Sequence, residues 1–149
     1  RAPQDGVTFA SQLKGDVEQV KWRPLGTSFA ASDESGRVSF YDPRNPAQAL
    51  AVLDAHGKSA TCIDFCPLDV NGNSIFLTAS SDKSLKVWSI DPSSTSFNCL
   101  LTREMGVGKI FGAGFLPDAP LIIGAAGNRG NVNMWNLKKE DVIKSYFTQ

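Results

Sequence analysis

The chain has 149 residues, of which 42% are hydrophobic and 20% are charged, an ordinary composition for one globular domain. Lysine plus arginine and aspartate plus glutamate each total 15, so the formal net charge is zero. A whole-chain electrostatic attraction to nucleic acid is therefore unsupported, and any such contact must come from a local patch of charge. No apolar run approaches the roughly 20 residues that a membrane-spanning helix requires.

Cysteine usage and the first residues give two further expectations. The chain has three cysteines, an odd number, and no signal-like segment, which predicts free thiols and an intracellular location. It starts at Arg1 and soon enters strand-like sequence, so we expect a fragment of a longer protein.

Strand-like segments and turns follow one another from the N-terminus in a repeating order. A stretch at 7–14, VTFASQLK, precedes three units of about 45 residues each. Each unit opens with a strand that has an aromatic residue two positions before a proline: VEQVKWRP, ATCIDFCP and IFGAGFLP. Proline cannot donate to a β-ladder, so it belongs where a strand gives way to a loop.

A second marker recurs with the first. Tyr41, Trp88 and Trp135 lie at equal spacing, and apolar residues stand three and one positions before each, the alternation of a half-buried strand. Turn residues and a short strand of small and apolar residues precede each marker. A fourth strand-like piece follows each: ALAVL at 49–53, NCLLTRE at 98–104 and DVIKSYFT at 141–148.

Four short strands per unit predict an all-β fold, a β-propeller with WD-type blades. We expect three blades, 16–54, 55–105 and 106–149, within one segment spanning 1–149, with 7–14 as the outer strand of a preceding blade. Three blades form an incomplete propeller, because common propellers have about four blades or more. We therefore expect further blades or other copies of the chain to cover the apolar faces at both ends.

The middle unit resembles a WD repeat most closely. In such repeats a histidine, a turn aspartate, a strand serine or threonine and the tryptophan indole form one chain of hydrogen bonds. The resemblance implies a structural network of His56, Asp82, Trp88 and either Ser80 or Thr78. Each polar group would cost about 1–3 kcal/mol if buried alone, so we expect this network to serve stability rather than acid–base catalysis. The outer units lack it.

Other candidate chemistry is weak. Cys62 and Cys66 share one face of a strand near His56, but a zinc site needs four ligands at loop spacings. The stretch GVGKIFGAG at 106–114 lacks the Gly-Lys-Ser/Thr ending of a phosphate-binding loop. No nucleophile elbow or paired-carboxylate arrangement is present. We predict a noncatalytic protein without cofactor, metal or small-molecule substrate.

Loops are the expected binding surface of such a fold. One rim of the blades should carry the basic residues Arg37, Lys58, Lys83, Lys109 and Arg129, which form the candidate binding rim. Basic side chains at a rim could contact phosphate or an acidic partner, whereas any one of them alone is more simply explained as solubilising charge.

The order of the three units resembles the C-terminal part of the periodic tryptophan protein 1 family of WD-repeat proteins. Most of the specificity lies in Arg-Glu-Met at 103–105, followed by Phe-Leu-Pro-Asp-x-Pro-Leu-Ile at 115–122. The resemblance implies a nuclear and nucleolar scaffold for ribosome biogenesis and rRNA processing. It would bind assembly factors of the large subunit and pre-ribosomal RNA. The alternative is a general protein-interaction WD propeller of another pathway, such as a substrate receptor or coat component.

Overall fold

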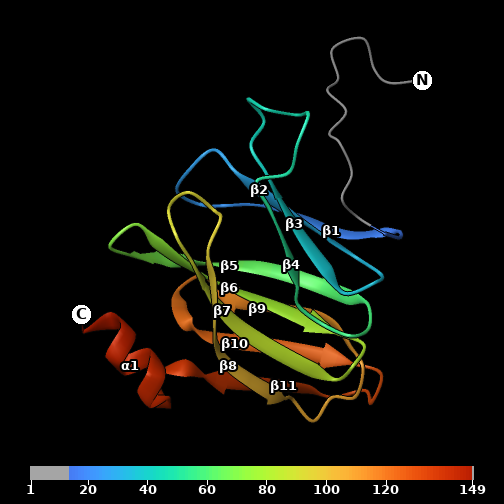
Figure 1. Cartoon of the computed structure of the whole chain (residues 1–149). Coiled ribbons are helices and arrows are strands. Elements are labelled where there is room, and N and C mark those ends of the chain that lie inside the picture. The colour runs from blue at the N-terminus through green and yellow to red at the C-terminus, as the bar shows by residue number, and fades with distance from the viewer. Residues whose placement is uncertain (1–13, 149) are drawn as a thin grey trace.

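Three antiparallel β-sheets stack face to face in the computed structural model, which describes residues 14–148 (Figure 1). The first sheet holds β1 (Val17–Trp22), β2 (Phe29–Asp33), β3 (Arg37–Tyr41) and β4 (Ala51–Asp54). The second holds β5 (Ala60–Val70), β6 (Asn73–Ser80), β7 (Ser84–Ile90) and β8 (Phe97–Glu104). The third holds β9 (Ile110–Leu116), β10 (Ala119–Gly127) and β11 (Val132–Asn136), followed by η1 (Leu137–Lys139) and α1 (Asp141–Phe147).

Within each sheet every strand pairs with its neighbour in sequence, which is the topology of propeller blades. The predicted all-β class and the incomplete propeller are therefore confirmed. The strand predicted at 7–14 lies outside the described residues, apart from Lys14. None of the helices in residues 14–148 is long and apolar enough to cross a membrane.

The C-terminal segment corrects one expectation. The sequence predicts a strand over 141–148, whereas the structure has α1 there. Ile143 is buried against the core, and Tyr146 and Phe147 pack on the same cluster. These three residues are spaced at helical intervals, and a strand would send neighbouring side chains to opposite faces. The third sheet consequently has three strands instead of the predicted four.

Two apolar layers hold the three sheets together. The layer between the first and second sheets is aromatic: the Phe40 ring centroid lies 5.6 Å from that of Phe76 and 6.5 Å from that of Phe65. The layer between the second and third sheets contains buried Leu77 and Trp135. Because successive side chains of a strand point to opposite faces, the second sheet supplies residues to both layers.

The first strands of neighbouring sheets are also joined by polar contacts. Gln19 Oε1 accepts a hydrogen bond of 2.7 Å from the backbone N–H of Ile63. One sheet further on, Asp64 Oδ2 accepts one of 2.8 Å from the backbone N–H of Phe115. Strands β5 and β9 pair with a strand on one edge alone, so these side chains satisfy donors on the other edge.

Arg23 joins the loop after β1 to the loops of the second sheet. Its side chain is only 4% exposed, and it donates to Ser74 Oγ at 2.9 Å, Ser94 Oγ at 2.8 Å and the Asp91 carbonyl at 2.8 Å. A further bond of 3.1 Å reaches the Gly72 carbonyl. Burial lowers the pKa of Arg23, but arginine remains protonated in proteins, so the guanidinium acts as a clamp between two sheets.

We expect Arg23→Ala to lower the free energy of unfolding by about 3 kcal/mol, because several buried acceptors lose their donor together. Urea denaturation followed by circular dichroism measures the change. Arg44→Ala is the matched control, since Arg44 is exposed and pairs with the nearby Asp42 at 2.6 Å. Equal unfolding midpoints for the two variants would contradict the clamp.

Candidate functional site

The turns and entering segments at one end of the sheets are here called the turn rim: residues 34–36, 55–59, 81–83, 105–109 and 128–131. The backbone N–H groups of Ala55 and His56 both donate to the Gly36 carbonyl at 3.1 Å. Gly36 has a φ of 94°, and a Cβ there would meet the His56 carbonyl oxygen, so this turn requires glycine. The rim is thus held by backbone contacts between successive units.

Contacts within single units supplement this one, beginning with the Glu34 N–H, which donates to the Asp16 carbonyl at 3.0 Å in the first sheet. The Ser81 N–H donates to the Ser59 carbonyl at 3.2 Å, and the Arg129 N–H donates to the Val107 carbonyl at 3.2 Å. Each turn between the second and third strands of a sheet is therefore tied to the segment that enters that sheet.

All five basic residues predicted for the binding rim lie on the turn rim or directly beside it. Lys58, Lys83, Lys109 and Arg129 are exposed. Arg37 is partly buried, and its Nε donates to Asp54 Oδ1 at 3.0 Å. Four exposed cations consequently face solvent from turns whose backbones are fixed.

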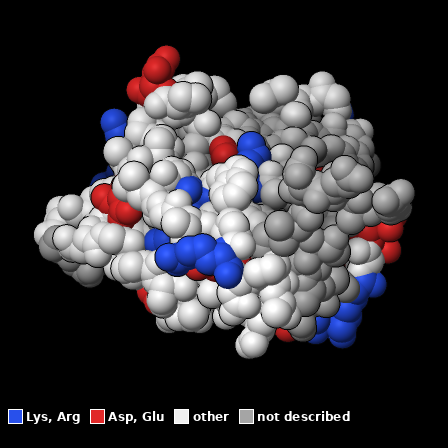
Figure 2. Space-filling model, turned by 90° about the horizontal axis from the view of Figure 1, so that it is seen from above, with Lys and Arg blue, Asp and Glu red and all other residues white. Residues whose placement is uncertain are grey.

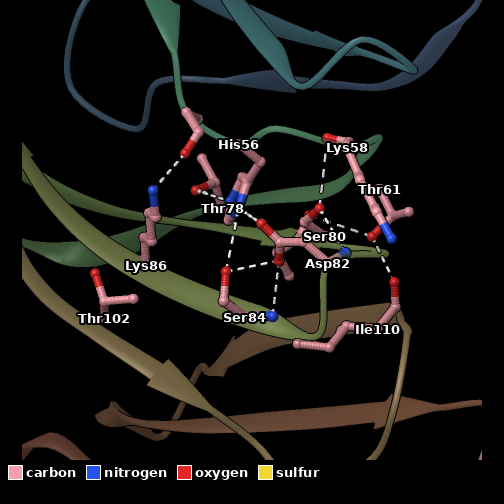
Figure 3. A network of polar contacts seen from close by, with 12 residues as sticks. His56, Lys58, Thr61, Thr78, Ser80, Asp82, Ser84, Lys86, Thr102 and Ile110 are labelled. Carbon is pink, nitrogen blue, oxygen red and sulfur yellow. Dashed lines mark hydrogen bonds and ion pairs between the residues drawn. The ribbon is translucent and has the colours of Figure 1, made fainter.

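A chain of hydrogen bonds runs from Trp88 through the second sheet to the rim, and Figure 3 shows its part formed by Thr78, His56 and Asp82. Trp88 Nε1 lies 2.9 Å from Thr78 Oγ1, which lies 2.8 Å from His56 Nε2. His56 Nδ1 lies 3.0 Å from Asp82 Oδ2. Of the two candidates left open by the sequence, Thr78 contacts the imidazole.

Donor and acceptor capacity assigns the protons along this chain. The Trp88 indole N–H only donates, so the Thr78 oxygen accepts its hydrogen bond, and the Thr78 hydroxyl donates a hydrogen bond to His56 Nε2. His56 is then a neutral imidazole whose Nδ1–H donates to Asp82. A second ring proton would turn Nε2 into a donor and displace the Thr78 hydroxyl proton. Burial, with the nearby Lys86 ammonium, lowers the pKa of His56 despite the opposing Asp82 carboxylate.

Asp82 also shapes the turn beneath two rim cations. Its Oδ1 accepts from the Ser84 N–H at 2.8 Å and from the Ser84 hydroxyl at 2.7 Å. Burial opposes ionisation, but these bonds and the contact with His56 hold the pKa of Asp82 below its usual value. Ser80 Oγ accepts from the Asp82 N–H at 3.0 Å and lies 3.4 Å from the Lys58 carbonyl. The network therefore fixes the backbone at Lys58 and at Lys83, which has a φ of 76°.

The third sheet uses different partners at the same places. Ala125 replaces the threonine, and Trp135 Nε1 donates instead to Glu140 Oε1 at 2.9 Å. Asn133 Nδ2 donates to the Met105 carbonyl at 2.6 Å, as Lys86 Nζ donates to the Ala55 carbonyl at 2.7 Å. A side chain from the third strand thus holds the entering segment in both sheets.

The first sheet has a turn carboxylate that the sequence analysis missed. Asp33 is fully buried, and its Oδ1 accepts from the backbone N–H groups of Ser35 at 2.9 Å and Arg37 at 3.0 Å. Burial opposes ionisation, yet hydrogen bonds from Lys14, Ser35 and Arg37 hold the pKa of Asp33 below its usual value. The signal was the aspartate that opens the turn DESG, since aspartate commonly bonds the backbone two residues on.

None of the three cysteines forms a disulfide. Cys62 and Cys66 are buried, Cys99 is exposed, and all three thiols are free. Burial raises the pKa of both Cys62 and Cys66. Among residues 14–148, no group of three or more histidine, cysteine, aspartate or glutamate side chains could hold a metal ion.

We expect Asp82→Ala to lower the free energy of unfolding by about 2 kcal/mol, because the Ser84 N–H and the imidazole N–H lose their acceptor. Thermal and urea denaturation measure the loss. Asp141→Ala is the control, because that carboxylate is 96% exposed and should leave the midpoint unchanged. An Asp82→Ala chain that melts like the wild type would show that the network is not stabilising.

Stability should depend on pH through His56, the single histidine of the chain. Its pKa is lower in the folded chain, so the unfolded chain binds the proton more readily. The contribution is complete above about pH 6.5 and decreases as the pH falls below that value. Lowered aspartate pKa values act in a more acidic window, below about pH 4.

Urea denaturation at about pH 7.5 and about pH 5.5 tests this dependence. The wild type should lose stability between the two values, and His56→Gln should lose less, although it starts from a lower stability. If the free energy of unfolding falls by the same amount between the two pH values in both chains, His56 does not titrate as described.

Comparisons with known proteins agree with this architecture. Residues 47–89 match the family model described as "WD domain, G-beta repeat". This range starts near β4 of the first sheet and ends within β7 of the second. The matched repeat therefore includes the last strand of the first sheet and the first three strands of the second, so it joins two neighbouring sheets.

Several curated proteins are similar over parts of the chain. The U3 small nucleolar RNA-associated protein 15 of Saccharomyces cerevisiae is 26% identical over 136 residues, covering 91% of this chain and 25% of that protein. The ribosome biogenesis protein WDR12 homolog of Ixodes scapularis is 37% identical over 87 residues, covering 54% and 20%. The protein transport protein sec13 of Aspergillus clavatus is 29% identical over 101 residues, covering 59% and 34%.

The matched regions span about a third or less of these relatives, and none of the three names describes an enzyme. The names cover ribosome biogenesis, a small nucleolar RNA and protein transport, so they do not point to one pathway. The match over 47–89 and the three stacked sheets agree with an incomplete β-propeller that contains a WD repeat.

Proposed function

We propose that the chain is part of a noncatalytic scaffold in assembly of the large ribosomal subunit, in the nucleus and nucleolus. The observation that carries the nucleolar part of this proposal is the similarity to U3 small nucleolar RNA-associated protein 15 along 91% of the chain. The large subunit is taken from the resemblance to the periodic tryptophan protein 1 family. A second relative is named for ribosome biogenesis. Within this function, the order of the units supports the periodic tryptophan protein 1 family, with 16–54, 55–105 and 106–149 as its blades.

The turn rim is the proposed binding surface for assembly proteins. Lys58, Lys83, Lys109 and Arg129 are exposed on turns that are held by backbone bonds and, in the second sheet, by the His56–Asp82 network. Because the backbones of these turns are already held, contact with acidic side chains costs the rotamer freedom of the cations but little backbone freedom. Pre-ribosomal RNA is the second proposed ligand, because phosphates meet the same requirement.

The distribution of charge favours local contacts. The chain has zero formal net charge, and Figure 2 shows lysine and arginine side chains in separate groups with acidic side chains between them. A partner would therefore contact a few cations at a time, and RNA binding should be weak and strongly dependent on salt.

A general interaction role in another pathway is the second candidate. The similarity to protein transport protein sec13 over 59% of the chain favours it specifically. In that case the same rim would bind one protein partner, with little effect of salt and without RNA.

Affinity capture with the chain as bait separates the two functions. The bait is incubated with nuclear extract, and the bound RNA is sequenced while the bound proteins are identified by mass spectrometry. The ribosomal function predicts large-subunit precursors and assembly factors, with loss of RNA as salt is raised. Recovery of transport proteins without ribosomal precursors would overturn it.

A matched pair of triple variants tests the role of the rim. Lys58→Glu, Lys83→Glu and Lys109→Glu together should reduce the captured precursors about tenfold, because charge reversal places like charges at the contact. The control reverses three exposed lysines at the opposite, C-terminal end of β11: Lys138, Lys139 and Lys144. Equal losses in the two variants would remove the turn rim as the binding surface.

A further inference from the structure

The hairpin between β5 and β6 has an asparagine followed by a glycine at its tip. Val70 pairs with Asn73, so Asn71 and Gly72 alone form the loop, at the end of the second sheet opposite the turn rim. Both have a positive φ, 53° and 81°, as in the turns that join two strands through two residues. Both are also exposed, so solvent reaches the tip.

The groups of this pair that can react with each other are free. Within the described part of the chain, neither the Asn71 side-chain amide nor the Gly72 backbone N–H has a hydrogen-bond partner. Gly72 has no side chain to shield its nitrogen, and this is the single Asn-Gly pair in the sequence. The asparagines of β11 and of the turn before it, by contrast, each use their side-chain amide in a hydrogen bond: Asn128, Asn131, Asn133 and Asn136.

We propose that Asn71 is a site of spontaneous isoaspartate formation, and that Arg23 controls its rate. The Gly72 nitrogen loses its proton to hydroxide and attacks Cγ of Asn71. The N–Cγ bond forms, the Cγ–Nδ2 bond breaks, and ammonia leaves with a proton taken from water. Water then opens the succinimide ring at either carbonyl. Opening at the Asn71 backbone carbonyl leaves the main chain running through Cγ, which is isoaspartate, and opening at Cγ gives aspartate.

Arg23 holds the same turn from the first sheet. Its Nη2 donates to the Gly72 carbonyl at 3.1 Å, and its Nε donates to Ser74 Oγ at 2.9 Å. Ring closure draws the Gly72 nitrogen toward the Asn71 side chain, which changes the backbone of a short loop whose ends are fixed by strand pairing. The bond from Arg23 resists that movement. The reaction therefore proceeds in the fraction of molecules in which the tip has opened locally.

The modification in turn acts on the contact between the first and second sheets. Isoaspartate lengthens the main chain of the tip by one carbon atom and adds a negative charge. A two-residue turn has a defined geometry, so the extra atom displaces Gly72 from its place. The Gly72 carbonyl then loses the bond from Arg23, whose other acceptors lie in the same loops of the second sheet.

Storage of the purified chain at mildly alkaline pH tests the site, because hydroxide starts the reaction. Tryptic digestion with tandem mass spectrometry locates the product, and methylation by a protein isoaspartyl methyltransferase with labelled S-adenosylmethionine verifies that isoaspartate has formed. Asn71 should convert with time. Asn98 is the internal control, because it is exposed but lies within β8 and precedes a cysteine. Conversion of Asn71 no faster than that of Asn98 overturns the proposal.

A matched pair of variants tests the control by Arg23. Arg23→Ala should convert Asn71 about fivefold faster than the wild type, because the tip opens more readily without this hydrogen bond. Asp82→Ala is the control, since it weakens the same sheet at the opposite end and should leave the rate unchanged. Circular dichroism verifies that both chains are folded.

Arg23→Lys takes the place of the alanine variant if that chain does not fold, because lysine keeps the charge but cannot reach all of the acceptors. It should also accelerate the conversion of Asn71. Equal rates in the wild type and the Arg23 variant, or equal acceleration by Asp82→Ala, would show that Arg23 does not control the reaction and would overturn the proposal.

Urea denaturation of the modified chain tests the effect on the sheets. Asn71→Asp is the matched control, because it adds the same charge to a main chain of ordinary length and aspartate tolerates positive φ. The isoaspartate fraction, isolated by ion exchange, should unfold at a lower urea concentration than freshly prepared Asn71→Asp. Equal midpoints would overturn the proposed effect on the contact between the sheets.

Discussion

Every other feature of this protein depends on the packing of one β-sheet on the next. A sheet of four short strands has two apolar faces and cannot bury either by itself. The second sheet buries both, with Phe76 in one layer and Leu77, its neighbour in the chain, in the other. The outer sheets bury one face each, and the first strands add polar contacts from Gln19 and Asp64. Stability therefore increases with each neighbour that a sheet gains.

The polar network has a different role from the apolar layers. It connects a buried indole, Trp88, to a turn on the surface through Thr78, His56 and Asp82. A layer of apolar side chains fixes the distance between sheets but leaves their turns mobile, whereas directional bonds fix the turn itself. The second sheet alone combines all four of these groups among the residues described, while Asp33 orders the corresponding turn in the first sheet. The resulting rim presents cations from a rigid support, which suits a scaffold that positions other molecules.

The alignment of the second and third sheets on Trp88 and Trp135 also separates two kinds of variation between repeats. Substitutions such as Thr78 to Ala125 change how a sheet is held internally, and new bonds, such as that from Trp135 to Glu140, compensate. Substitutions such as Leu77 to Gly124 change the shape of a face. The first kind preserves the packing within a sheet, and the second changes the surface on which a neighbouring sheet could pack.

The sequence by itself determined the repeat, because alternation, turn residues and the spacing of Tyr41, Trp88 and Trp135 are local properties of the chain. The resemblance of the middle unit to a WD repeat also implied the residues of the second-sheet network. It did not choose between Ser80 and Thr78, because both lie on one face of β6 and only the position of the imidazole distinguishes them.

Tertiary structure decided the rest. The segment at 141–148 has strand-like composition, but packing of Ile143 against the core favours a helix. The role of Arg23 was hidden as well, because its acceptors lie about 50 to 70 residues away and are brought together by the stacking of sheets. An apolar hollow of about 400 Å³, lined by Gly114, Gly124 and Met134 among others, exists only because β9, β10 and β11 lie side by side, so no single segment predicts it.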